Sequence, residues 1–229
     1  MSLKNYDDDF RSVHGEYIAG IDECGRGSCA GSIVAACVLM DSTVFIPGVN
    51  DSKKLSEKKR NELYDQILKN AIKIHVSTRD QYFIDKHGIN RANKEIIEES
   101  ALEVLRYHKV DLFILDQASD ISLKNMHMLP KADSTSFVVA CASIVAKVIQ
   151  CRLMKNLDEQ YPNYKFLSNK GYLTKDHIQA IVENGLSDVH RKSYSYKFIW
   201  KTWFFCIFFM CNTLHIDANS YDLFTIIRY

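Results

Sequence analysis

Short apolar segments alternate with amphipathic segments along most of this chain, and that alternation constrains the fold more than any other feature. Four segments have the apolar or alternating pattern of strands: residues 16–22, 31–40, 72–79 and 110–116. Four segments have helical periodicity: residues 56–70, 90–108, the later part of 131–161, and 174–184. Strands that alternate with helices predict an α/β fold with a mixed or parallel central sheet flanked by helices.

Length and apolar content indicate one globular domain with small additions at its ends. The chain has 229 residues, of which 47% are hydrophobic. We expect an N-terminal tail over residues 1–17, one domain over 18–196 with a helical C-terminal element from about residue 156, and an aromatic-rich tail over 197–229 of unknown role. The uninterrupted apolar part of that tail, residues 203–211, is about half the roughly 20 residues that a membrane span needs. It therefore favours a buried or partner-facing segment over a membrane anchor.

Charge and cysteine content narrow the class of protein. The net charge is +1, so binding to nucleic acid must depend on local clusters rather than on a global positive field. The seven cysteines are odd in number, and several lie inside apolar runs, as reduced core cysteines do. The N-terminus is acidic and lacks the apolar core of a signal peptide. These features favour a reducing, cytoplasmic compartment.

Four acidic residues stand where a site is expected. Asp22 and Glu23 end the first strand-like segment, Asp116 ends the fourth, and Asp133 lies in a polar loop before an apolar helix. Sites in α/β sheets are built at strand ends, and carboxylates gathered in one cleft attract Mg²⁺ or Mn²⁺. The plainer readings are that Asp116 is a turn residue and that Asp133 caps the helix. The residues by themselves leave both readings open.

An ordered set of motifs over Ile18–Tyr194 resembles the ribonuclease HII family. The matching segments are GIDECGRGSCAG at 20–31, NDSKKLSEKKR at 50–60, FILD at 113–116, KADSTSFVVACASIVAKV at 131–148, NKGYLTKDH at 169–177 and HRKSY at 190–194. The resemblance covers about three quarters of the chain. It implies an RNase H-like fold with a C-terminal helical element.

The resemblance also implies an activity and its cofactors. Members of the family are endonucleases that hydrolyse the RNA strand of RNA–DNA hybrids and nick 5′ to ribonucleotides embedded in duplex DNA, leaving a 3′-hydroxyl and a 5′-phosphate. Asp22, Glu23, Asp116 and Asp133 match the catalytic and metal-binding acids. The implied cofactor is Mn²⁺ or Mg²⁺, two ions per site. The implied partners are the hybrid and ribonucleotide-containing DNA, with no membrane, and we expect a monomer.

Substrate-binding residues follow from the same match. Gly25, Arg26 and Gly27 match the motif that grips the ribonucleotide, and Tyr172 matches the tyrosine that packs on the next sugar. Basic side chains are expected to contact phosphates: Lys53, Lys54, Lys147 and Arg191, the last within His190–Lys192. Without the resemblance, Tyr172 would be an ordinary turn aromatic and the lysines solvated side chains.

Departures from the family pattern leave some details open. Ser28 and Ser32 replace prolines, and Leu173 replaces a glycine after the tyrosine. Gln150 and Cys151 replace an Arg-Asp pair, so a salt bridge on that helix is expected to be lost. Two alternatives remain: a hybrid-binding protein without activity, and ribonuclease HIII. The presence of all four acids argues against the first, and the short segment before the first strand argues against the second.

Overall fold

The computed structural model describes residues 3–116, 121–194 and 196. A five-stranded mixed sheet lies at its centre in the order β3-β2-β1-β4-β5. The strands are β1 (Ile18–Cys24), β2 (Ile33–Met40), β3 (Ala71–Arg79), β4 (Leu112–Leu115) and β5 (Met126–Met128). β1 pairs with β2 antiparallel and with β4 parallel. The expected mixed central sheet is thereby confirmed.

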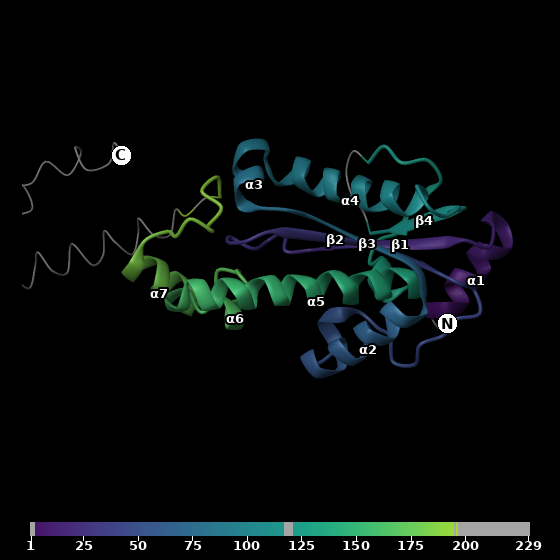
Figure 1. Ribbon diagram of the computed structural model, residues 1–229, viewed down its shortest axis with the longest axis horizontal. Helices are drawn as coiled ribbons and strands as arrows, with labels where there is room; N and C mark the ends of the chain where they lie inside the picture. The colour runs from purple at the N-terminus through teal and green to yellow at the C-terminus, as the bar shows by residue number, and fades with distance from the viewer. Residues whose placement is uncertain (1–2, 117–120, 195, 197–229) are drawn as a thin grey trace, which may run out of the picture.

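Helices cover both faces of the sheet (Figure 1). The helices are α1 (Leu3–His14), α2 (Glu57–Asn70), α3 (Gln81–His87), α4 (Ile89–Leu105), α5 (Phe137–Gln160), α6 (Phe166–Asn169) and α7 (Lys175–Asn184). Short 3₁₀ turns occupy η1 (Ser52–Lys54), η2 (Ala132–Ser134) and η3 (Pro162–Tyr164). In Figure 1, α3 and α4 lie on one face, while α5 lies on the other with α2 beyond it.

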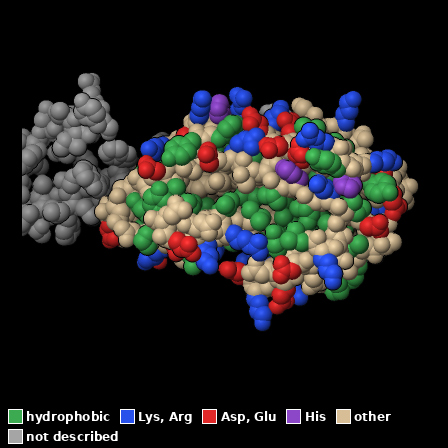
Figure 2. Space-filling model, in the orientation of Figure 1, with side chains coloured by type: hydrophobic (Ala, Val, Ile, Leu, Met, Phe, Trp, Pro, Cys, Tyr) green, Lys and Arg blue, Asp and Glu red, His purple; other side chains and the backbone are tan. Residues whose placement is uncertain are grey.

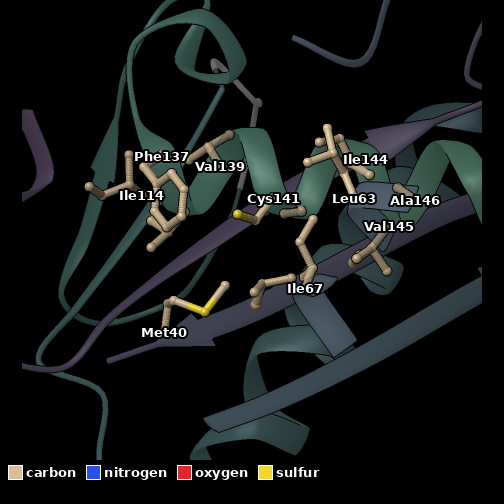
Figure 3. Packing of buried hydrophobic residues seen from close by; sticks show 14 of the residues in the cluster. Met40, Leu63, Ile67, Ile114, Phe137, Val139, Cys141, Ile144, Val145 and Ala146 are labelled. Carbon is tan, nitrogen blue, oxygen red and sulfur yellow. The ribbon is translucent and has the colours of Figure 1, made fainter. Parts of the chain in front are cut away.

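Each face of the sheet has its own hydrophobic core. On the α5 face, Leu63 and Ile67 of α2 pack with Ile114 and with the apolar side of α5 (Figure 3). On the opposite face, α4 contributes Ile96 and Ile97. α5 meets the length and composition of a membrane-crossing helix, but 72% of its most apolar window is buried in the protein. Its apolar content is therefore that of a core helix.

The close contact between β1 and α5 depends on Gly20. A Cβ atom at that position would lie 2.2 Å from the backbone carbon of Val138, which no real contact tolerates. The missing side chain lets the first turn of α5 lie directly on the strand. This contact brings η2, which precedes α5 and contains Asp133, towards the C-terminal end of β1.

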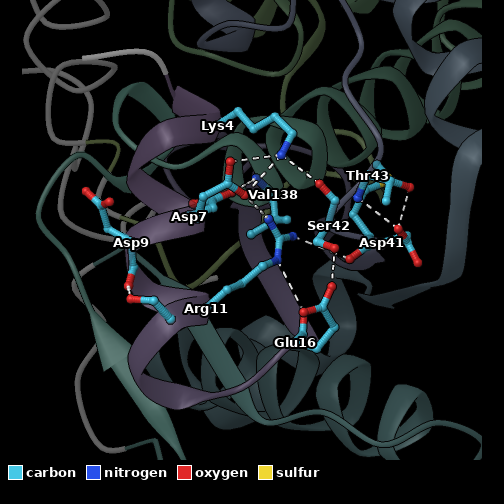
Figure 4. A network of polar contacts seen from close by, with 12 residues as sticks. Lys4, Asp7, Asp9, Arg11, Glu16, Asp41, Ser42, Thr43 and Val138 are labelled. Atoms are coloured by element: carbon cyan, nitrogen blue, oxygen red, sulfur yellow. Dashed lines mark hydrogen bonds and ion pairs between the residues drawn. The ribbon is translucent and has the colours of Figure 1, made fainter.

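The segment expected as an N-terminal tail contains a helix, α1. α1 occupies most of this segment, and its Asp7 and Arg11 side chains are buried. Asp7 Oδ2 accepts a hydrogen bond of 2.9 Å from the Val138 amide, and Arg11 Nε donates to the Glu16 carbonyl at 3.2 Å. Figure 4 shows this network, in which the Ser42 hydroxyl also donates to Glu16. The acidic composition of this segment favours a tail over a helix. In α1 the charges are paired locally, which compensates the acidic residues.

The surface seen in Figure 2 carries charges of both signs. Lys, Arg, Asp and Glu side chains crowd the two outer layers, and hydrophobic side chains gather between them. The mixed surface agrees with the net charge of +1. Any cluster that binds a polyanion is therefore local.

Candidate active site

The parallel pairing of β1 and β4 builds the site. Ile21 pairs with Leu115, so Asp22 and Asp116 are the next residues of two neighbouring strands. Alternation along β1 sends Asp22 to the α5 face and Glu23 to the α4 face. Consecutive acids in the sequence therefore point to opposite sides of the sheet end.

Asp22 lies in the least water-accessible part of the site. Burial, followed by the charges of Glu23 and Asp133, raises the pKa of Asp22 to about 8, and a hydrogen bond from the Ser143 hydroxyl opposes the rise. The Ser143 and Ser52 hydroxyl oxygens lie 2.8 Å apart. A buried carboxylate among like charges disfavours its own ionised form unless a cation compensates it.

Glu23 and Asp116 form the other side of the site. Burial is the main cause that raises the pKa of Glu23; the Arg26 charge opposes the rise and the Asp116 charge adds to it. Asp116 Oδ1 accepts a hydrogen bond of 3.0 Å from the Lys131 amide, which ties the end of β4 to the start of η2. The charge of each acid therefore acts on its neighbours across the strand ends.

Asp133 is buried in η2 and pairs with Lys53. Its Oδ2 lies 3.3 Å from the Lys53 ammonium, while 78% of the Lys53 side chain remains exposed to solvent. Partial burial lowers the pKa of Lys53, but the charges of Asp133 and Asp22 outweigh it and raise that pKa overall. Lys53 is therefore the cation that the site itself supplies.

We call Asp22, Glu23, Asp116 and Asp133 the strand-end acids. Across the described ranges, no three His, Cys, Asp or Glu side chains stand in an arrangement that could hold a metal ion as they are. Asp22 and Glu23 leave β1 on opposite faces, yet the charges of Glu23 and Asp133 act on Asp22, and the charge of Asp116 acts on Glu23. The chemistry of the donors fits Mg²⁺ or Mn²⁺, since all are carboxylate oxygens, and burial followed by the charge of a neighbouring carboxylate raises the pKa values of Asp22 and Glu23.

A cavity of about 230 Å³ opens beside the acids. Its lining residues are Asp22, Glu23, Cys24, Ser52, Lys53, Ser143, Lys147 and Tyr172. Lys53, Lys147 and Tyr172 are thus brought to the acids as the motifs predicted. Lys54 is not among the lining residues; 61% of its side chain is exposed, and its ammonium lies 3.8 Å from Asp51.

Residues 25–27, which we call the recognition loop, follow directly after β1. Gly25 has a φ of 94°, which favours glycine. Arg26 Nη2 donates to Asn90 Oδ1 of α4 at 2.9 Å. A Cβ atom at Gly27 would lie 3.4 Å from the Tyr172 ring, so the loop and the tyrosine are neighbours. The Tyr172 carbonyl lies 2.9 Å from His177 Nδ1.

Arg191 does not contact the solvent, and the expectation that it binds substrate phosphate is wrong. Its side chain is fully buried, and its guanidinium donates to the carbonyls of Gly25, Arg26 and Gly31. His190 beside it is also fully buried. The burial of His190 and Arg191 depends on contacts with residues about 160 positions earlier, which no local pattern shows, while Lys192 is exposed.

Three polar residues of the site were not among the site residues predicted from the sequence. Gln150, which stands in place of the family's Arg-Asp pair together with its neighbour, makes two hydrogen bonds. Its Nε2 donates to the Lys170 carbonyl at 3.1 Å, and its Oε1 accepts from Lys147 at 3.3 Å. Ser143 lies one helical turn before Lys147, and that spacing on α5 was the only available indication. Asn90 had none.

Comparison with known proteins agrees with the motifs. The Ribonuclease HII family model matches residues 19–203. A ribonuclease HII of Caldanaerobacter subterraneus is 40% identical over 185 residues, covering 80% of this chain and 76% of its own. The ribonuclease H2 structure from Pyrococcus horikoshii aligns with a TM-score of 0.67 at 23% identity, covering 82% of this chain and 98% of its own. A Bst-RNase HIII structure in complex with Mn²⁺ aligns with a TM-score of 0.64 at 18% identity, covering 80% and 69%.

Proposed function

The chain belongs to the ribonuclease HII family, and on that premise we propose that its strand-end acids are the catalytic residues. The protein is an endoribonuclease that hydrolyses the RNA strand of RNA–DNA hybrids and nicks 5′ to ribonucleotides in duplex DNA, leaving a 3′-hydroxyl and a 5′-phosphate. The family assignment also decides between ribonucleases HII and HIII. The observation that carries the site assignment is the pairing of Ile21 with Leu115, which sets Asp116 beside the two acids of β1 that line the cavity.

The strand-end acids would hold the divalent metal on which the family depends. We propose two Mg²⁺ or Mn²⁺ ions, which would supply the acidity that activates a water molecule and would stabilise the leaving 3′-oxygen. Asp22 must lose its proton to act as a ligand, since its pKa is raised to about 8 by burial and by neighbouring carboxylates. Lys53 balances the charge of Asp133 and directs its exposed ammonium to the cavity, where a phosphate can bind.

The remaining cavity residues would bind the substrate. Lys147 lies 6.0 Å from the centre of the Tyr172 ring and 3.3 Å from Gln150, so its ammonium stays beside the cavity. Tyr172 remains 39% exposed and lies against the recognition loop, a position from which its ring can pack on a sugar. Lys54 is exposed enough to contact a more distant phosphate, and such contacts weaken with salt.

We further propose that the protein acts as a monomer in the cytoplasm. The five cysteines within the described residues are all free thiols, as a reducing compartment favours. Light scattering of the purified protein and localisation of a tagged copy would test the two statements.

The decisive experiment is cleavage of a DNA duplex that contains one ribonucleotide, with Mn²⁺ or Mg²⁺. The intact protein should nick 5′ to the ribonucleotide, and Asp22→Asn should lower the rate by at least about a hundredfold. Asp65→Asn, at an exposed position on α2, is the matched control and should retain the rate. Chelation of the metal should stop the reaction. An intact protein that binds the duplex but does not cut it would overturn the proposal in favour of a binding protein.

A further inference from the structure

Arg191 is the largest fully buried side chain, and its guanidinium is directed at the backbone of the recognition loop. Nη2 donates to the Gly25 carbonyl at 2.8 Å, and Nη1 donates to the Arg26 carbonyl at 3.0 Å. Nε donates to the Gly31 carbonyl at 3.0 Å. A buried cation is costly unless its donors are satisfied, and here three backbone carbonyls satisfy them.

Tyr194 adds a second donor to the same loop. Its hydroxyl donates to the Arg26 carbonyl at 2.7 Å and accepts from Arg191 Nη1 at 2.8 Å. The Arg26 carbonyl therefore receives hydrogen bonds from two side chains of one C-terminal segment. Deleting the Tyr194 hydroxyl would remove one of them and leave the guanidinium in place.

The segment that carries these side chains is hydrogen-bonded to residues 29–31, which follow the recognition loop. The Arg191 amide donates to the Cys29 carbonyl at 2.8 Å, and the Gly31 amide donates to the Val189 carbonyl at 2.8 Å. Ala30 and His190 form an antiparallel bridge between the same two segments. Arg191 and Tyr194 therefore reach the loop from a rigid base.

The geometry of the peptide bond gives these contacts a consequence. In a trans peptide the C=O of one residue and the N–H of the next point in opposite directions. The carbonyls of Gly25 and Arg26 point at Arg191, so the amides of Arg26 and Gly27 point away from it. We propose that Arg191 and Tyr194 are positioning residues that aim these two amides at the substrate ribose. This inference rests on the proposed function, in which the loop identifies the ribonucleotide.

The test compares Tyr194→Phe with a matched control, Tyr164→Phe. Tyr164 is buried in the same C-terminal cluster, but its hydroxyl donates to the Gly185 carbonyl at 2.9 Å, away from the loop. In Ca²⁺, the binding preference for a duplex with one ribonucleotide over an all-DNA duplex should fall about 3- to 10-fold in Tyr194→Phe, the range expected for one hydrogen bond. All-DNA affinity and Mn²⁺ affinity should be unchanged, and Tyr164→Phe should retain the full preference.

A second measurement separates this inference from the proposed function. Hydrogen exchange of peptides spanning residues 24–28 should speed up in Tyr194→Phe and not in Tyr164→Phe, whatever the substrate proves to be. Arg191→Lys should lower the binding preference for the ribonucleotide duplex more than Tyr194→Phe does, by about 10- to 100-fold. One ammonium cannot donate to three carbonyls in fixed directions. If exchange is unchanged, or if the variant loses ribose and DNA binding equally, the positioning role is wrong. An intact protein without any ribonucleotide preference would instead overturn the proposed function.

Discussion

Single residues acquire different functions according to the face of the sheet on which they lie. Asp22 and Glu23 are adjacent in sequence, yet β1 directs Asp22 to the α5 face and Glu23 to the α4 face. Asp22 therefore interacts with Asp133 near α5, and Glu23 interacts with Asp116 after β4. The acidic pair therefore places one carboxylate on each face of the sheet rather than two on one face.

Asp22→Asn should stabilise the protein without metal. The unfolded carboxyl titrates near 3.8 and the folded one at about 8, so the folded state holds its proton more tightly and loses stability as the pH rises between these values. Asn does not titrate, so its advantage should grow from pH 4 to 8 and reach about 1–3 kcal/mol above pH 8. Chemical denaturation with chelator at pH 5 and 9 measures it. If the difference in stability between Asp22→Asn and the unaltered protein is the same at both pH values, the raised pKa is contradicted.

Tyr172→Ala should separate two substrates. Its ring lies beside Gly27 and is 39% exposed, so under the proposed function it would contact the sugar adjacent to the one that the loop reads. Cleavage at a single ribonucleotide should fall about tenfold more than cleavage of a long hybrid, which corresponds to about 1.4 kcal/mol. Tyr82→Ala, 62% exposed on α3, is the control and should affect neither. Equal losses on both substrates would show that Tyr172 does not read the junction.

At the scale of elements, α1 helps to cap α5. Ser136 caps α5 by accepting from the Val139 amide, and Asp7 of α1 accepts from the Val138 amide. These bonds satisfy amides that the first turn of a helix leaves unpaired. Because Asp133 precedes that turn, α1 supports a strand-end acid from the other end of the chain.

Asp7→Ala should lower the stability of the fold by about 1–3 kcal/mol, because a buried amide of α5 loses its acceptor. Asp7→Asn keeps an oxygen that can accept this hydrogen bond and should retain most of the stability. Thermal unfolding measures both variants. Asp9→Ala, at an exposed position on α1, is the control. An Asp7→Ala protein as stable as the control would show that α1 is not needed to cap α5.

Across the whole molecule, the C-terminal segment completes the site that the N-terminal strands begin. Tyr196 is the last described residue, and its hydroxyl donates to the carbonyls of Cys29 and Arg191 at 3.0 and 3.1 Å. The C-terminal hydrophobic cluster joins Cys29 to Phe166 and Tyr196. The aromatic run over residues 203–211 lies outside the described residues, so its expected packing stays a prediction.

A chain that ends after Tyr196 should stay folded and cut the ribonucleotide duplex. Among the described residues, every one that lines the cavity or anchors the recognition loop precedes that point. A chain that ends after Arg191 is the matched comparison; it loses Tyr194 and Tyr196 and should unfold at lower temperature. Thermal unfolding and the cleavage assay together measure both. Loss of activity in the longer chain would show that the remaining residues contribute to the site.

The sequence by itself determined the local structure and the chemistry of this protein. Strand and helix periodicity marked β1–β4 and the long helices, and the ordered motifs identified the four acids, because both depend on residues near one another in the chain. Only the tertiary structure decided that Asp22 and Glu23 face apart, that residues 3–14 are helical, and that Arg191 is buried under the recognition loop. Burial and hydrogen-bond partners depend on contacts between distant segments, and no local pattern in the sequence records them.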